Sequence, residues 1–168
     1  MGATTFSGPV KSLGGFISAG SGNDINITAD DTLTVQGFAG RMLRVNDADC
    51  KITLPTIVAT TPNDPTAPDQ ANNIGASFSF FIETTATDLD IKTDGTDKFV
   101  GGLYTGVDNA TGKTFISGAA NDVITLNGTT TGGLAGSMIT VTAIASAKYA
   151  VTGITLGSGT LVTPFADA

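Results

Sequence analysis

Apolar and polar residues alternate along most of this 168-residue chain. A two-residue period places successive side chains on opposite faces of a strand, and it is typical of strands with one buried face. Clusters of Gly, Asn and Asp separate the alternating pairs, so we expect short strands joined by turns. The pairs are Ile25 and Ile27, Leu33 and Val35, Leu43 and Val45, Ile52 and Leu54, Leu89 and Ile91, Ile139 and Val141, and Tyr149 and Val151.

Short, evenly spaced strands are typical of sandwiches and barrels, so the pattern predicts an all-β fold, an antiparallel β-sandwich. The length suits one domain with a substantial core. We expect an N-terminal arm over residues 1–22 and a single sandwich domain over residues 23–168. The most apolar strand candidate is ASFSFFIE, residues 76–83, which predicts a central strand buried on both faces.

Residues 31–45 resemble residues 122–141, with TTTGG (129–133) inserted in the turn of the second copy. Such internal similarity predicts that one strand-turn-strand unit occurs twice, as equivalent hairpins of a two-sheet core. A chance match in a chain rich in Thr and Gly is the alternative.

Three segments depart from the alternation and expose apolar residues among Gly and Pro. They are TFSGPVKSLGGFI (5–17), the region 55–75 with its four prolines, and GTLVTPF (159–165). Region 55–75 is predicted to be a long exposed loop, which either contacts a partner or is simply flexible. Apolar groups on irregular backbone point to contacts between subunits. The candidate contact residues are Phe6, Pro9, Val10, Phe16, Ile17, Pro62, Pro65, Pro164 and Phe165.

Composition narrows the possible functions. The formal net charge is −7 and the eight basic residues are scattered, which argues against nucleic acid as a partner. No apolar run has the length of a membrane span, and the first residues lack the features of a secretory signal. We therefore expect no membrane partner. Cys50 is the single cysteine and cannot form an internal disulfide, and it is expected to be a small buried or half-buried side chain.

The groups that enzymes usually need are scarce. The chain has no His, one Cys and one Glu, Glu83, so the usual triads are excluded. Carboxylate pairs occur at Asp47 with Asp49 and at Asp88 with Asp90, where the solvated face of a strand is the simpler interpretation. The acidic run from Asp88 to Asp97 could hold calcium, but its spacing differs from an EF-hand loop and TDGTD already predicts a turn. We expect no enzyme, cofactor or metal site.

Four stretches resemble the small β-rich virion proteins of tailed bacteriophages, especially head decoration (cement) proteins of marine phages. They are TFSGPVKSLGGFI (5–17), DKFVGG (97–102), ITLNGTTTGGLAGSMITV (124–141) and KYAVTGITLGSGTLVTPF (148–165). The resemblance covers most of the chain. It implies a jelly-roll-like sandwich, a homotrimer, and extended arms that bind adjacent subunits.

The resemblance also implies a partner and a location. The partner would be the major capsid protein, whose contacts the protein would stabilise on the outer surface of the assembled head after synthesis in the host cytoplasm. The alternatives are a tail- or fibre-associated virion protein and a glycan-binding adhesin domain. An adhesin would use exposed aromatic side chains, and only Tyr104 and Tyr149 are available beside the phenylalanines.

Overall fold

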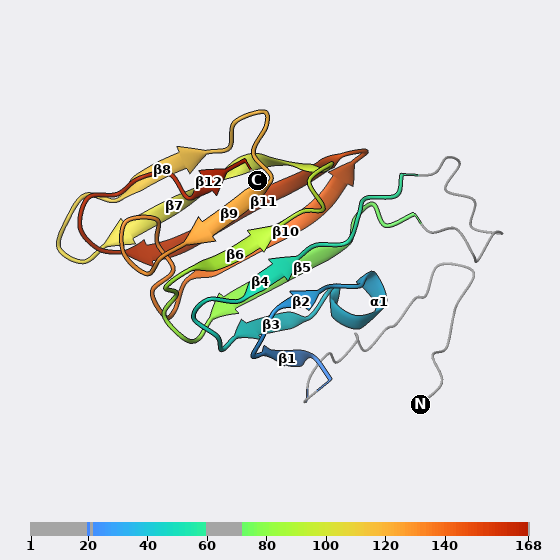
Figure 1. Cartoon of the computed structure of the whole chain (residues 1–168), viewed down its shortest axis with the longest axis horizontal. Helices are drawn as coiled ribbons and strands as arrows, with labels where there is room; N and C mark the ends of the chain where they lie inside the picture. The colour runs from blue at the N-terminus through green and yellow to red at the C-terminus, as the bar shows by residue number, and fades with distance from the viewer. Residues whose placement is uncertain (1–19, 21, 60–71, 168) are drawn as a thin grey trace, which may run out of the picture.

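A computed structural model of the chain describes residues 20, 22–59 and 72–167, which form two β-sheets that pack face to face (Figure 1). One sheet has seven strands in the order β1 (Asp24–Ile27), β3 (Met42–Val45), β5 (Ser77–Ile82), β10 (Met138–Ala145), β11 (Lys148–Gly157), β7 (Lys98–Val107) and β8 (Lys113–Ile116). The other has five, in the order β12 (Phe165–Ala166), β9 (Val123–Leu126), β6 (Leu89–Lys92), β4 (Lys51–Thr53) and β2 (Asp31–Thr32).

The core lies between the sheets and is built from the alternating apolar positions. Leu43, Phe80 and Val141 of the seven-stranded sheet and Ile52 and Ile91 of the five-stranded sheet each have 0% of their surface exposed. Each belongs to one continuous buried cluster. Burial of one face per strand is what the alternation predicts, and the all-β sandwich is confirmed.

The strand pairing differs from the antiparallel, jelly-roll-like arrangement that the sequence analysis predicts, because both sheets are mixed. From β1 to β6 the chain alternates between the sheets, so that β1, β3 and β5 are mutually parallel in one layer and β2, β4 and β6 in the other. Successive strands of one sheet are separated by a strand of the other sheet. They therefore run in the same direction, whereas a hairpin connection would reverse them.

A single hairpin completes the seven-stranded sheet. Its two strands, β10 and β11, pair antiparallel with each other, and they lie between β5 and β7. On one side β10 pairs antiparallel with β5, and on the other β11 pairs parallel with β7. The hairpin therefore joins the strands β1, β3 and β5 to the strands β7 and β8 in one sheet.

Strand β5 is central in its sheet, as predicted, but only one of its faces is fully buried. Phe78, Phe80 and Ile82 point into the core, while Ser77, Ser79 and Phe81 alternate with them and are half-buried. The prediction of burial on both faces is therefore wrong. No layer covers the outer side of this sheet in the part of the chain that the structure describes.

The alternating pair Leu33 and Val35 does not form a strand. Leu33 is buried, but the chain turns after it into the short helix α1 (Val35–Phe38), and Val35 is 37% exposed. Thr34 caps this helix, because its hydroxyl oxygen accepts a hydrogen bond from the backbone N–H of Gly37. Threonine at such a cap competes with strand formation, which explains the wrong prediction.

The two similar segments, 31–45 and 122–141, have the same arrangement in the structure, but neither is a hairpin. In each copy the first strand, β2 or β9, lies in the five-stranded sheet and the second, β3 or β10, lies in the seven-stranded sheet. The two second strands lie on either side of β5. Leu43 and Ile139, which occupy equivalent positions in the two segments, therefore both pair with Phe80. Each copy is thus a crossing between sheets.

The described ends of region 55–75, residues 55–59 and 72–75, contain no strand and are held together by Asn73. The side-chain oxygen of Asn73 accepts a hydrogen bond from Val58 N (2.8 Å), and its Nδ2 donates to Thr56 O (2.8 Å). Its backbone N–H also donates to Val58 O (3.0 Å). The Asn73 side chain thereby closes the base of the region.

This base is also attached to the rest of the sandwich. The N–H of Ile57 donates to the buried carboxylate of Asp97 (2.7 Å), and the hydroxyl of Tyr149 donates to Pro55 O (2.5 Å). On the other side, Gly75 N–H donates to Ala143 O in β10 (2.8 Å). The described ends of the region are therefore attached to β10 and β11 of the seven-stranded sheet and to Asp97, which precedes β7.

Replacement of Asn73 tests this description. We expect Asn73→Ala to lower the free energy of unfolding by about 1–3 kcal/mol, because it removes two side-chain hydrogen bonds and leaves a backbone donor and acceptor without their partner. Urea unfolding followed by circular dichroism measures the change. Asn26→Ala, at an exposed position of β1, is the control and should differ from wild type by less than about 0.5 kcal/mol. Equal free energies of unfolding for the two variants would contradict the role of the Asn73 side chain at the base of the region.

Candidate interaction surface

The outer face of the seven-stranded sheet carries almost no charge over its four central strands, β5, β10, β11 and β7. Strands β5 and β10 contain no charged residue, and β7 and β11 each contain one lysine, at the first position. We call this surface the neutral face. It is made by Ser77, Ser79, Phe81, Val100, Tyr104, Met138, Thr140, Thr142, Ala150, Thr152, Ile154 and Leu156.

An apolar row crosses the neutral face at right angles to the strands. Met138 pairs with Phe81 on one side and with Ile154 on the other, and Ile154 pairs with Tyr104. Met138 and Tyr104 are each 45% exposed and Ile154 is 57% exposed. Cross-strand neighbours have Cβ atoms about 5 Å apart, so these four side chains form one continuous strip.

A groove of about 380 Å³ lies beside the apolar row, at the C-terminal ends of β7 and β11. Leu156 belongs to both, because it lies two residues after Ile154 on the same face of β11 and also lines the groove. Val107 and Leu134 form the other apolar walls, and Asp108 is the single carboxylate in the lining. The lining is thus mainly apolar, with one acidic group.

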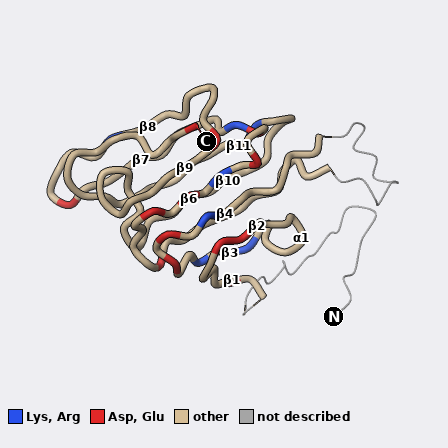
Figure 2. The backbone as a smooth tube through the Cα atoms, in the orientation of Figure 1, with Lys and Arg blue, Asp and Glu red and all other residues tan. Residues whose placement is uncertain are grey.

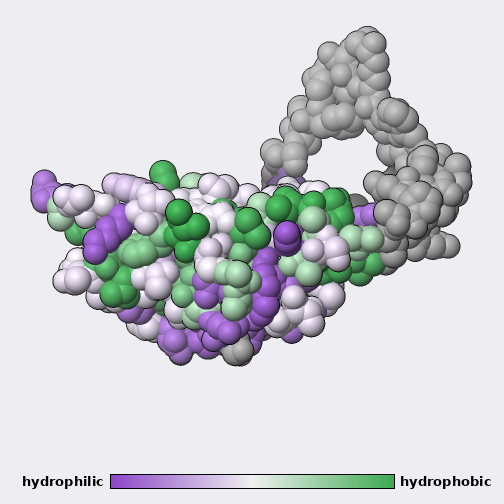
Figure 3. All heavy atoms as spheres, turned by 90° about the horizontal axis from the view of Figure 1, so that it is seen from above, coloured by the Kyte–Doolittle hydropathy of each residue, from purple (hydrophilic) through white to green (hydrophobic). Residues whose placement is uncertain are grey.

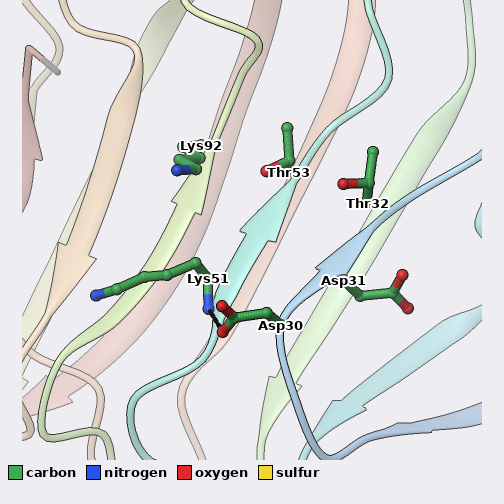
Figure 4. Close-up of a pocket in the computed structure, with 6 residues that line it drawn as sticks. All are labelled: Asp30, Asp31, Thr32, Lys51, Thr53 and Lys92. Atoms are coloured by element: carbon green, nitrogen blue, oxygen red, sulfur yellow. Dashed lines mark hydrogen bonds between the residues drawn. The ribbon is translucent and has the colours of Figure 1, made fainter.

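The outer face of the five-stranded sheet is chemically different. It has a depression of about 290 Å³ lined by Asp30, Asp31, Thr32, Lys51, Thr53 and Lys92 (Figure 4). The Lys51 ammonium lies 2.9 Å from Asp88 Oδ2 and 3.1 Å from Asp90 Oδ2. Charges of both signs therefore alternate here, and those of Lys51, Asp88 and Asp90 are already compensated within the chain.

The pictures show the same division. In Figure 2, charged positions gather on β2, β4 and β6 and in the turns. In Figure 3, hydrophobic side chains stand out along the upper side of the described part, and hydrophilic ones gather along the lower side. A surface without charges costs little to desolvate, so the neutral face is the better candidate for contact with another macromolecule.

The carboxylate pairs do not assemble into an acid–base site. Asp88 and Asp90 share Lys51, as described above, and the Asp47 carboxylate accepts a hydrogen bond from the backbone N–H of Asp49 (3.0 Å). The hydrogen bond and negative charge of Asp47 raise the pKa of Asp49, which is exposed. These interactions are those of strand faces and turns.

The acidic run 88–97 ends in a hydrogen-bonded turn. Partial burial opposes ionisation of Asp94, but hydrogen bonds from Thr56, from Thr96 and from the backbone outweigh it and lower the pKa of Asp94 to about 2. Burial raises the pKa of Asp97, whose carboxylate accepts from Ile57 N. Within the described ranges, no group of three or more Asp, Glu, Cys or His side chains could hold a metal ion.

Two further residues singled out from the sequence belong to the core. Cys50 is 2% exposed, and burial together with the charges of nearby aspartates raises the pKa of its thiol to about 11. Tyr149 is 0% exposed, and burial raises its pKa as well. Of the two tyrosines that a glycan site could use, only Tyr104 lies on the surface.

Most of the predicted contact residues lie outside the described part of the chain. These are Phe6, Pro9, Val10, Phe16, Ile17, Pro62 and Pro65. Pro164 and Phe165 are described, and both are buried, with Phe165 6% exposed and packed in the core. Phe165 begins β12, which pairs with β9. The structure therefore uses these two side chains within the subunit, where the sequence analysis assigns them to a contact between subunits.

The neutral face itself is absent from the sequence predictions. Its apolar members are spread over four segments of the chain, and only the strand order brings them together. The one local signal is the lack of charge in SFSFFI and MITVTAIA, the sequences of β5 and β10, where polar positions are Ser and Thr. Uncharged outward positions on neighbouring strands would have indicated this surface.

No family model, no curated protein and no solved structure matches this chain. In the described residues, no helix is both long and apolar enough to cross a membrane.

Cys50 gives a direct test of the burial described here. Because the thiolate is the reactive form, a buried thiol with a pKa of about 11 should react slowly with a thiol reagent at pH 8. We expect at least a 100-fold slower reaction in the native protein than in urea-unfolded protein, measured with a chromogenic disulfide reagent. Similar rates in the two states would show that Cys50 is accessible.

Asp94 should contribute to the pH dependence of stability. Its folded-state pKa of about 2 lies below the unfolded value of about 3.9. The ionised carboxylate therefore stabilises the fold above about pH 4, and this contribution is lost as the pH falls toward 2. We expect Asp94→Ala to lower Tm at pH 6 and the difference from wild type to shrink between pH 4 and pH 2.

The control for this prediction is Thr32→Ala, at an exposed position of the five-stranded sheet, which removes no titratable group. Its Tm should differ from that of the wild type by the same amount at every pH. A constant difference between wild type and Asp94→Ala from pH 6 to pH 2 would contradict the role given to Asp94.

Proposed function

We propose that this protein is a structural subunit of a bacteriophage virion, and within that class a head decoration (cement) protein. It would bind the outer surface of the assembled head and stabilise contacts between subunits of the major capsid protein. The observation that carries the proposal is the neutral face. An uncharged sheet surface crossed by an exposed apolar row is an unusual feature in a chain with a formal net charge of −7.

The chemistry of a cement protein is burial of surface. Such a protein binds the assembled shell better than the free capsid subunit and thereby stabilises the assembled state by mass action. It needs a broad, rigid, easily desolvated surface and no catalytic group. The neutral face has these properties, since its four central strands are hydrogen-bonded along their length.

The resemblance of the sequence to decoration proteins of marine phages supports the choice within the virion. It points to self-association, as a homotrimer, and to the major capsid protein as partner. A tail- or fibre-associated role would use the same kind of surface. A glycan-binding adhesin is the second candidate class, and it is favoured by one observation, the 45% exposed ring of Tyr104 on the apolar row.

Co-sedimentation with phage heads tests the proposal. We expect the purified protein to bind heads of its own phage saturably, in a fixed ratio to the major capsid protein, both on intact heads and on emptied, expanded heads. Heads of an unrelated phage are the control and should leave the protein in the supernatant. Failure to sediment with either form of its own heads would overturn the decoration role and favour tails or glycans.

A further inference from the structure

We propose that residues 5–17 of one copy of this protein lie across the neutral face of a second copy. The inference rests on the proposed function, because it takes the chain to be a subunit of an assembly. It goes further by naming the occupant of the neutral face and of the groove beside it.

Among the described residues, none covers the neutral face. Ile154, Tyr104 and Met138 remain 57%, 45% and 45% exposed, although they form one strip. Val100 and Leu156, at 45% and 37%, extend the exposed apolar surface along β7 and β11. Burial of such an exposed apolar strip by a second chain is favourable in free energy.

Segment 5–17 has the matching composition. It contains five large apolar residues, Phe6, Val10, Leu13, Phe16 and Ile17, and its glycines and proline disfavour a helix. In an extended conformation its 13 residues span about 43 Å at about 3.3 Å per residue. The apolar row from Phe81 to Tyr104 crosses three strand spacings, about 14 Å. The segment is thus long enough to cover the row and to reach the groove.

The charges also match. Lys11 is the single charged residue of segment 5–17, and Asp108 is the single charged residue in the lining of the groove. Asp108 is exposed. A lysine placed beside it gains an ion pair where the rest of the surface offers none, which would fix the position of the segment along the face.

The polar positions of the neutral face suit a peptide backbone. Thr152 is exposed between the apolar row and Ala150, and Thr140 of the neighbouring strand β10 pairs with it. Hydroxyl groups can both donate and accept hydrogen bonds, so an extended segment lying over these positions can satisfy its backbone groups without charges.

Each copy has one segment 5–17 and one neutral face, and the contact joins these two different surfaces. The contact is therefore heterologous. Such contacts close into rings when the rotation between copies permits. A ring pairs every segment with a face, which leaves neither uncovered. The inference is therefore compatible with a homotrimer and does not require a separate interface.

Site-directed cross-linking of the full-length protein tests the inference. Ser12→Cys places a thiol in the segment, and Thr152→Cys places one on the neutral face. Thr32→Cys, exposed on the outer face of the five-stranded sheet, is the matched control. The native Cys50 is buried, so the introduced thiols are the reactive ones. The two single variants, one carrying a mass tag, are mixed and treated with a short bismaleimide.

We expect a covalent product with the summed mass of the Ser12→Cys and Thr152→Cys chains, and little product from Ser12→Cys with Thr32→Cys. The double variant Ser12→Cys/Thr152→Cys distinguishes the source of the segment. A product confined to a single chain would show that each segment covers its own face and would overturn the inference. Equal cross-linking to Thr32→Cys, or none to Thr152→Cys, would overturn it as well.

Charge reversal provides a second test, read by sedimentation velocity of the free protein. We expect Lys11→Asp to weaken self-association about tenfold, and Asp108→Lys in the same chain to restore it. Ile154→Lys should weaken self-association at least tenfold, because it places a charge in the apolar row. Unchanged self-association in Lys11→Asp and Ile154→Lys would overturn the inference.

These measurements use no phage heads, so their outcome is separate from that of co-sedimentation. Loss of head binding with intact cross-linking would leave a self-associating protein with another partner. Head binding without cross-linking would leave a decoration protein whose neutral face has a different occupant.

Discussion

The pairing of the β10–β11 hairpin with strands β5 and β7 is the interaction on which the rest of the structure depends. Without the hairpin the seven-stranded sheet would consist of two separate pieces, β1-β3-β5 and β7-β8, each with an open edge. The hairpin also supplies the middle of the core, through Ile139, Val141 and Tyr149. Its outer side supplies the centre of the neutral face. Stability and surface chemistry therefore depend on the same twenty residues, 138–157.

The two sheets share one core but face the surroundings with different chemistry. Outward positions of β4 and β6 carry Lys51, Asp90 and Lys92. Those of β10 and β11, apart from Lys148 at the start of β11, carry Thr, Ala and large apolar side chains. A soluble monomer has no need for this difference, because charged outward positions keep a sheet surface dissolved and separate. The difference fits the proposal that one sheet faces water and the other faces protein.

Local sequence predicted which residues are buried much better than it predicted which strands are neighbours. The alternation at Leu43 and Val45 or at Ile139 and Val141 identifies strands and their inward faces, because side-chain direction follows from a two-residue period. It carries no information on the pairing partner. The parallel pairing of β1 to β6 within each sheet, and the insertion of the β10–β11 hairpin between β5 and β7, therefore could not be predicted. For the same reason the neutral face, assembled from four segments, was missed. Local chemistry misled at Thr34, where a helix cap interrupts the alternation, and in β5, whose apolar sequence predicted burial of both faces.

The late position of the hairpin in the chain has a consequence for folding. Strands β5 and β7 are synthesised long before residues 138–157, so their facing edges stay unpaired until the last quarter of the chain has appeared. Pairing across such sequence separations is slow, because loop closure must precede the contacts that reward it. An open edge as apolar as SFSFFI is prone to pair with other chains in that interval. Association between incomplete chains is therefore the reaction that competes with folding until the hairpin is in place.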